Sequence, residues 1–147
     1  MAELVHPVRV EWSDCDPAGI LFYGNVFRWI DSASHRLMRE IGLTRDQALG
    51  PDVLVFAVVE AQCQFVAPAV YDDRLEVCCR VGEIKRRAIR LDFRVVRPQP
   101  PGEPLPVATA YEWRVLVTRG PAREMLSVDV PPALRRALEG FRADELP

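Results

Sequence analysis

A helical pattern of apolar residues runs through residues 26–41, near the start of the chain. Gly42 follows at the position where a helix C-cap is expected. Residues 44–49 predict a short second helix with Thr44 as its N-cap, ended by Gly50 and Pro51. The residues that we expect on the buried face of the long helix are Phe27, Ile30, Ser34, Leu37, Met38 and Ile41.

Apolar and polar residues alternate in most of the remaining chain, which predicts β-strands. One short strand is expected before the long helix, at residues 8–12. The strands expected after it lie at residues 53–65, 75–81, 89–95 and 107–117. A terminal helix introduced by two prolines should present one apolar face, made of Leu134, Leu138 and Phe141.

One long helix and about five strands predict a single α+β domain over residues 1–147, in which a curled antiparallel sheet wraps the helix. Residues 53–59 are almost wholly apolar and need more cover than one helix supplies. An open sheet also has edges that tend to pair with another chain. We therefore expect a homodimer or a homotetramer.

The composition is that of an ordinary globular domain and limits the classes of function. Apolar residues make up 49% of the 147 residues, and the net charge of −2 predicts neither a nucleic-acid partner nor an acidic membrane partner. No stretch is apolar enough to predict a membrane span, and no secretory pattern stands at the N-terminus, so we expect a cytoplasmic protein. Four cysteines and two histidines show no metal-ligand spacing, so no metal site is predicted.

The candidate chemistry lies just before the long helix. Asp14 and Asp16 flank Cys15 and are followed by a Pro-Ala-Gly turn. A carboxylate beside the start of a helix suits attack on a carbonyl, because the unpaired helix amides can bind the developing oxyanion. From the residues alone, Asp16 is equally well explained as a turn acid. Asp14 is better explained as a hydrogen-bonding loop residue than as a second catalytic acid.

The segment from Asp14 to Ile20, with Tyr23, Asn25 and residues 28–31, resembles the hotdog-fold thioesterases of the 4-hydroxybenzoyl-CoA thioesterase family. The likeness continues through residues 65–66, 71–73 and 85–87. It implies a hotdog fold, hydrolysis of an aromatic or short-chain acyl-CoA, and no cofactor apart from the coenzyme A of the substrate.

The resemblance also implies roles for individual residues. Asp16 matches the catalytic carboxylate, which acts as nucleophile or general base, and Tyr23 matches the residue whose backbone N–H binds the thioester oxygen. Gly24 replaces a proline of the aromatic-acyl relatives and offers a further N–H. Asp31 matches an acid near the acyl pocket. The cations that match a phosphate-binding run for coenzyme A are Lys85, Arg86 and Arg87.

Two other functions are compatible with the same residues. One is a non-catalytic module that binds acyl-CoA or an acyl carrier protein, and the other is a structural partner in an envelope-associated complex. The residues do not identify the acyl group of the substrate, because the aromatic side chains suit either an aryl pocket or the hydrophobic core. These side chains are Trp12, Phe22, Trp29, Phe56 and Phe65.

Overall fold

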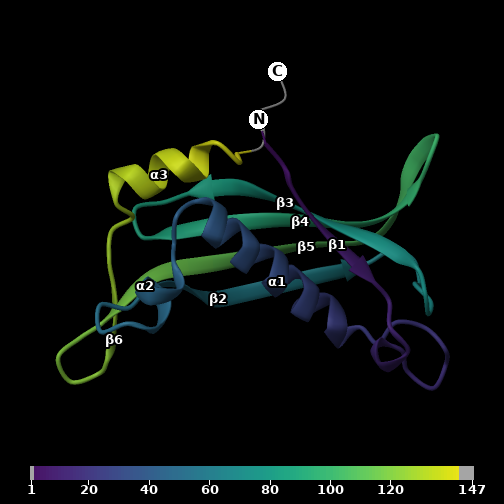
Figure 1. Ribbon diagram of the computed structural model, residues 1–147, viewed down its shortest axis with the longest axis horizontal. Coiled ribbons are helices and arrows are strands. Elements are labelled where there is room, and N and C mark those ends of the chain that lie inside the picture. The colour runs from purple at the N-terminus through teal and green to yellow at the C-terminus, as the bar shows by residue number, and fades with distance from the viewer. Residues whose placement is uncertain (1, 143–147) are drawn as a thin grey trace.

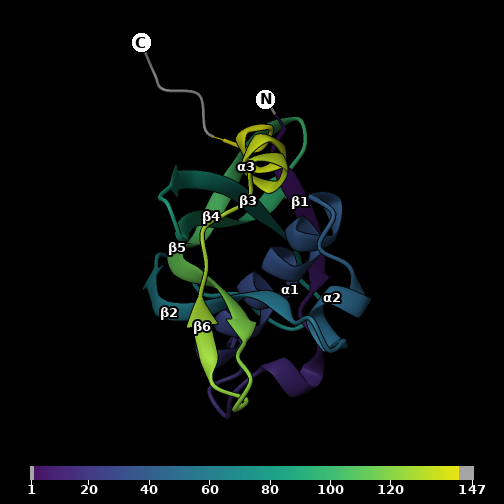
Figure 2. The ribbon, with the colours of Figure 1, turned by 90° about the vertical axis from the view of Figure 1, so that its left-hand side faces the viewer.

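A curled antiparallel sheet wraps around one long helix in the computed structural model, which describes residues 2–142 (Figures 1 and 2). The strands are β1 (Leu4–Arg9), β2 (Leu54–Phe65), β3 (Arg74–Ile84), β4 (Ala88–Gln99), β5 (Gly102–Arg119) and β6 (Met125–Ser127). The helical elements are a 3-10 turn η1 (Trp12–Asp14), α1 (Gly24–Glu40), α2 (Arg45–Leu49) and α3 (Pro132–Glu139).

The strand order is β1-β3-β4-β5-β2, every neighbouring pair is antiparallel, and β6 adds to β5. The first strand begins earlier than the alternation predicts. Its pairing with β3 runs from Leu4 opposite Cys79 to Arg9 opposite Arg74, and the chain then turns into η1, where Trp12 is 77% exposed. The prediction of a strand through Trp12 was therefore wrong, because cross-strand register rather than local alternation sets where β1 ends.

Helix α1 buries one face against the concave side of the sheet, chiefly against β1 and β3. The predicted face is confirmed apart from Phe27, which is only partly buried, and Val26 and Trp29 widen it. The predicted residues that are buried are Ile30, Ser34, Leu37, Met38 and Ile41. Gly42 follows the helix with a φ of +95°, which confirms the predicted C-cap. The Thr44 hydroxyl accepts from the Gln47 N–H at 3.3 Å, which confirms the N-cap of α2.

Strand β2 lies at one edge of the sheet, which the sequence did not reveal. A bulge between Val58 and Glu60 interrupts its pairing with β5. Val58 and Val59 are 45% and 63% exposed. The apolar run that predicted a covered strand is therefore exposed to solvent in a single copy of the chain. No helix in residues 2–142 is both long enough and apolar enough to cross a membrane.

Candidate active site

Asp16 lies in a tight turn that its own side chain stabilises. Its Oδ1 accepts from the Ala18 N–H at 2.8 Å, and its carbonyl accepts from the Gly19 N–H at 2.9 Å. Gly19 has a φ of +80°, the left-handed region that favours glycine. The Asp16 Oδ2 atom forms no hydrogen bond within residues 2–142, so half of this partly exposed carboxylate is available to a substrate or a water molecule.

The first residues of α1 present unpaired amides beside this turn. The Asn25 N–H donates to the Phe22 carbonyl at 3.0 Å, and the Val26 N–H donates to the Tyr23 carbonyl at 3.2 Å. Within residues 2–142, no hydrogen bond is formed by the backbone N–H of Tyr23 or Gly24. Free amides at the positive end of a 17-residue helix favour an anionic oxygen.

An apolar pocket of about 440 Å³ adjoins the start of α1. Tyr23 and Val26 form one wall, and the end of β2 with the segment that follows it forms another. The Tyr23 ring meets the Phe65 ring edge-on, with 6.2 Å between their centroids. Apart from the Tyr23 hydroxyl, the side chains that line this pocket carry no polar group, so it suits an apolar acyl group.

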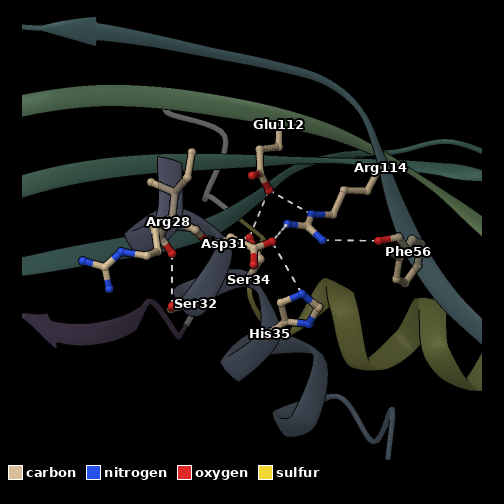
Figure 3. A network of polar contacts seen from close by, with 9 residues as sticks. Arg28, Asp31, Ser32, Ser34, His35, Phe56, Glu112 and Arg114 are labelled. Carbon is tan, nitrogen blue, oxygen red and sulfur yellow. Dashed lines mark hydrogen bonds and ion pairs between the residues drawn. The ribbon is translucent and has the colours of Figure 1, made fainter. Parts of the chain in front are cut away.

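Asp31 points toward the sheet rather than into this pocket, and Figure 3 shows the contacts that it makes. Its Oδ1 accepts from Arg114 Nη2 at 2.9 Å and lies 3.5 Å from His35 Nε2. Arg114 is 2% exposed, and its Nε donates to Glu112 Oε2 at 2.8 Å. Buried Arg114 therefore joins β5 to the exposed Asp31 of α1, so Asp31 has a structural partner within its own chain.

Arg114 and Glu112 were missed by the sequence analysis, although a signal for them exists. The two residues stand at alternate positions of a strand whose other inward side chains are apolar, such as Leu116 and Ala108. Charged residues on a buried face are costly unless they pair with each other. Their spacing of two residues could have predicted a paired, inward-facing site.

The three predicted cations lie on the turn between β3 and β4, where Asp129 faces Arg86 and Arg87 and Trp113 faces Lys85. The Arg87 Nε donates to Asp129 Oδ1 at 2.7 Å, which lowers the pKa of that carboxyl below its ordinary value. Arg86 lies 3.7 Å from the same oxygen and its side chain is 75% exposed. Lys85 stacks over the Trp113 ring at 4.3 Å from the centroid. Arg86 is thus the cation most open to a phosphate.

Within one chain, this cation turn and the Asp16 turn lie at opposite ends of the sheet (Figure 1). The Asp16 turn is joined to the segment before β3 by the bridge between Ile20 and Val70. The cation turn follows the last residue of β3, a strand of 11 residues, so roughly 35 Å of extended chain separates them. One chain does not bring its own cations to its own Asp16.

The cysteine side chains are free thiols. Burial raises the pKa of the Cys63, Cys78 and Cys79 thiols, which keeps them protonated and unreactive. Within residues 2–142, no group of three or more His, Cys, Asp or Glu side chains is arranged to hold a metal ion.

Comparison with known proteins finds relatives of this chain. The family model described as the thioesterase superfamily matches residues 18–102. The chain is 32% identical over 125 residues to the 4-hydroxybenzoyl-CoA thioesterase of Pseudomonas sp. strain CBS-3, and the match covers 84% of this chain and 88% of that one.

Two solved structures have the same fold. A 4-hydroxybenzoyl-CoA thioesterase, solved as an aspartate-to-asparagine mutant complexed with 4-hydroxybenzoyl-CoA, superposes with a TM-score of 0.81 at 28% identity, covering 92% of this chain and 98% of that one. A gentisyl-coenzyme A thioesterase superposes with a TM-score of 0.74 at 29% identity, and the match covers 92% of this chain and 98% of that one. The arrangement of sheet and helix is the predicted hotdog fold.

Proposed function

This chain belongs to the thioesterase superfamily and is a thioester hydrolase, and on that premise we propose that it cleaves an aromatic acyl-CoA with Asp16 as its reacting carboxylate. The observation that carries the proposal is the position of the Asp16 turn directly before the free amides of α1. A carboxylate with an open oxygen and two unpaired N–H donors are the groups that acyl transfer requires.

The proposed reaction divides the work between the turn and the helix. The Tyr23 N–H, with the Gly24 N–H beside it, donates to the thioester oxygen and stabilises the negative charge that develops there. Asp16 then either attacks the carbonyl carbon to form an acyl anhydride, or removes a proton from the water that attacks it. In the first route the carbon–sulfur bond breaks as the anhydride forms, and water then hydrolyses the anhydride, which releases the acid and regenerates the Asp16 carboxylate. In the second route the water oxygen bonds to the carbonyl carbon and the carbon–sulfur bond then breaks. In both routes a proton from the water passes to the departing sulfur, so coenzyme A leaves as the thiol.

Two observations support an aromatic acyl group. The pocket beside Tyr23 has aromatic and aliphatic walls and, at about 440 Å³, has room for a single or a fused ring. The relatives described above act on 4-hydroxybenzoyl-CoA and gentisyl-CoA, as their names state. Because the Tyr23 hydroxyl is the one polar side-chain group in that lining, we expect few ring hydroxyls to be recognised.

The proposed function is tested by thiol release from a panel of acyl-CoA thioesters. We expect benzoyl-type thioesters to be hydrolysed with a kcat/KM at least about tenfold above that of acetyl-CoA or butyryl-CoA, the discrimination that an apolar pocket provides for added apolar atoms. Faster hydrolysis of the short aliphatic substrates would contradict the aromatic assignment. Tight binding of coenzyme A without hydrolysis of any thioester would favour a binding module instead.

We also propose that a second copy of the chain completes the site. The free edge of β2 has exposed apolar residues and can pair with the same edge of another copy. Leu54 pairs with Thr118 and Ala88 pairs with Val115, so β2 begins at the cation end of the sheet and ends near the Asp16 turn. Antiparallel pairing of two β2 edges would therefore place the cations of one copy near Asp16 of the other.

Replacing Arg86 with alanine is expected to raise KM for acyl-CoA about tenfold with little change in kcat, because a lost phosphate contact weakens ground state and transition state alike. Steady-state kinetics would measure this, with an acyl-pantetheine thioester as the matched substrate that has no nucleotide phosphates. An equal rise in KM for both substrates would contradict phosphate binding at Arg86.

A mixture of Arg86→Ala and Asp16→Asn chains tests whether the site is shared. If Asp16 and Arg86 of one site come from different copies, each hybrid dimer contains one site with both parental residues. After refolding together, the mixture should show about a quarter of the parental activity when assayed at a substrate concentration well below the parental KM. At that concentration, activity no higher than the average of the two separate variants would show that each chain uses its own cations.

A further inference from the structure

Asp14 is a buried acid whose contacts join the turn of Asp16 to the start of α1. It is 5% exposed at the end of η1, whereas Ser13 before it is exposed and Asp16 after it is partly exposed. Its Oδ2 accepts from the Glu11 N–H at 2.8 Å, and its Oδ1 accepts from Arg28 Nη2 at 2.6 Å. Arg28 stands on the second turn of α1, so the Asp14 side chain joins the loop to the helix.

The main chain of Asp14 makes a second set of contacts with the same helix. Its carbonyl accepts from the Phe22 N–H at 2.9 Å and from Asn25 Nδ2 at 2.8 Å. Phe22 and Asn25 stand on either side of the two free amides, those of Tyr23 and Gly24. Asp14 therefore holds the chain immediately before and immediately after the amides.

These contacts have a geometric consequence for the reaction. Asp16 is two residues from Asp14, and the Cys15–Leu21 bridge closes the loop between them and the helix. The contacts of Asp14 therefore lie between the Asp16 turn and the Tyr23 amide. A displacement of about 1 Å between reacting groups is enough to slow an enzyme by about a hundredfold.

We propose that Asp14 is a positioning residue, which holds the Asp16 carboxylate in register with the amides at the start of α1 through its ion pair with Arg28 and its contact with Asn25. The inference rests on the proposed function, in which Asp16 and those amides act on the same carbonyl. Because Asp14 is 5% exposed and both of its carboxylate oxygens accept hydrogen bonds, we assign it no contact with the substrate.

The test replaces Asp14 with asparagine, which keeps the size of the side chain and its main-chain contacts but removes the charge that pairs with Arg28. We expect kcat for a benzoyl-type thioester to fall about 30- to 100-fold while KM changes less than about threefold. Asn25→Ala, which removes only the amide contact, should lower kcat by a smaller factor. Arg28→Lys, which keeps a cation at this position, should retain more activity than Arg28→Gln, which does not.

Glu3→Gln is the matched control, because Glu3 also pairs with two arginines, Arg80 and Arg94, but on strands away from this loop. We expect its kcat to equal that of the parent. Hydrogen exchange gives a second readout that does not depend on activity. Amide exchange in residues 14–25 should accelerate in Asp14→Asn and stay unchanged in Glu3→Gln.

The outcomes separate this inference from the proposed function. A parent protein that hydrolyses no thioester would contradict the proposed function, whereas the exchange measurement would still report whether Asp14 holds the loop. If Asp14→Asn folds and retains kcat within about twofold of an active parent, the positioning role is wrong. If Asp14→Asn does not fold, the other three variants decide. A kcat equal to that of the parent in Asn25→Ala, Arg28→Lys and Arg28→Gln would overturn the positioning role.

Discussion

Asp16→Asn is expected to lower kcat for thioester hydrolysis by roughly 10²- to 10⁴-fold while KM stays close to the parental value. Asparagine keeps an oxygen that can accept from the Ala18 N–H, so the turn should survive. It carries no charge and has neither the basicity nor the nucleophilicity of a carboxylate. Loss of an interaction made mainly in the transition state lowers kcat rather than substrate affinity.

Steady-state kinetics on the best substrate of the panel, with calorimetric binding of the same substrate to the mutant, would measure this effect. The related aspartate-to-asparagine mutant complexed with 4-hydroxybenzoyl-CoA supports the feasibility of the binding experiment. Asp52→Asn is the matched control, since Asp52 is an exposed aspartate that also adjoins a proline, Pro51. If Asp16→Asn and Asp52→Asn both turn over at the parental rate, Asp16 does not react with the substrate.

Tyr23→Pro is expected to lower kcat by about 10²- to 10³-fold, because proline removes the backbone N–H that we propose as the oxyanion donor. This corresponds to about 3–4 kcal/mol of lost transition-state stabilisation. The fold should tolerate the change. Tyr23 has a φ of −55°, which proline adopts, and its N–H forms no hydrogen bond within residues 2–142.

The control for this variant is Tyr23→Ala, which loses the same ring but keeps the N–H. Circular dichroism would establish that both variants are folded, and their kcat values would then isolate the contribution of the amide. We expect the alanine variant to lose far less than the proline variant, with its main loss in KM because the ring lines the pocket. Equal kcat in the two variants would assign the oxyanion contact to another donor, and Gly24→Pro would then test the adjacent amide.

The candidate site was predictable in those parts that depend on neighbouring residues. The turn at Asp16 follows from the local preferences of aspartate, proline and glycine. The helix after it follows from its apolar period and from Gly42, which takes up the left-handed conformation of a C-cap. The hairpin that carries Lys85, Arg86 and Arg87 follows from the alternation of its two strands.

The same local rules failed wherever distant segments meet. They did not predict that Asp31 would pair with Arg114, because those residues are 83 positions apart and meet only when α1 packs on β5. They extended the first strand to Trp12, although pairing with β3 ends at Arg9. Both features depend on distant segments: the end of β1 is set by its register with β3, and the Asp31–Arg114 contact is set by the packing of α1 on the sheet.

The sequence by itself determined the fold class, the long helix and the Asp16 turn before it, since each depends on side chains within a few residues of one another. Only the tertiary structure decided that Asp14 is buried against Arg28, and that the cations stand a strand's length from Asp16. Packing brings together groups that the chain separates, and a long strand holds apart groups that a family resemblance assigns to one site. That geometry is the physical reason for proposing a site shared between two copies of the chain.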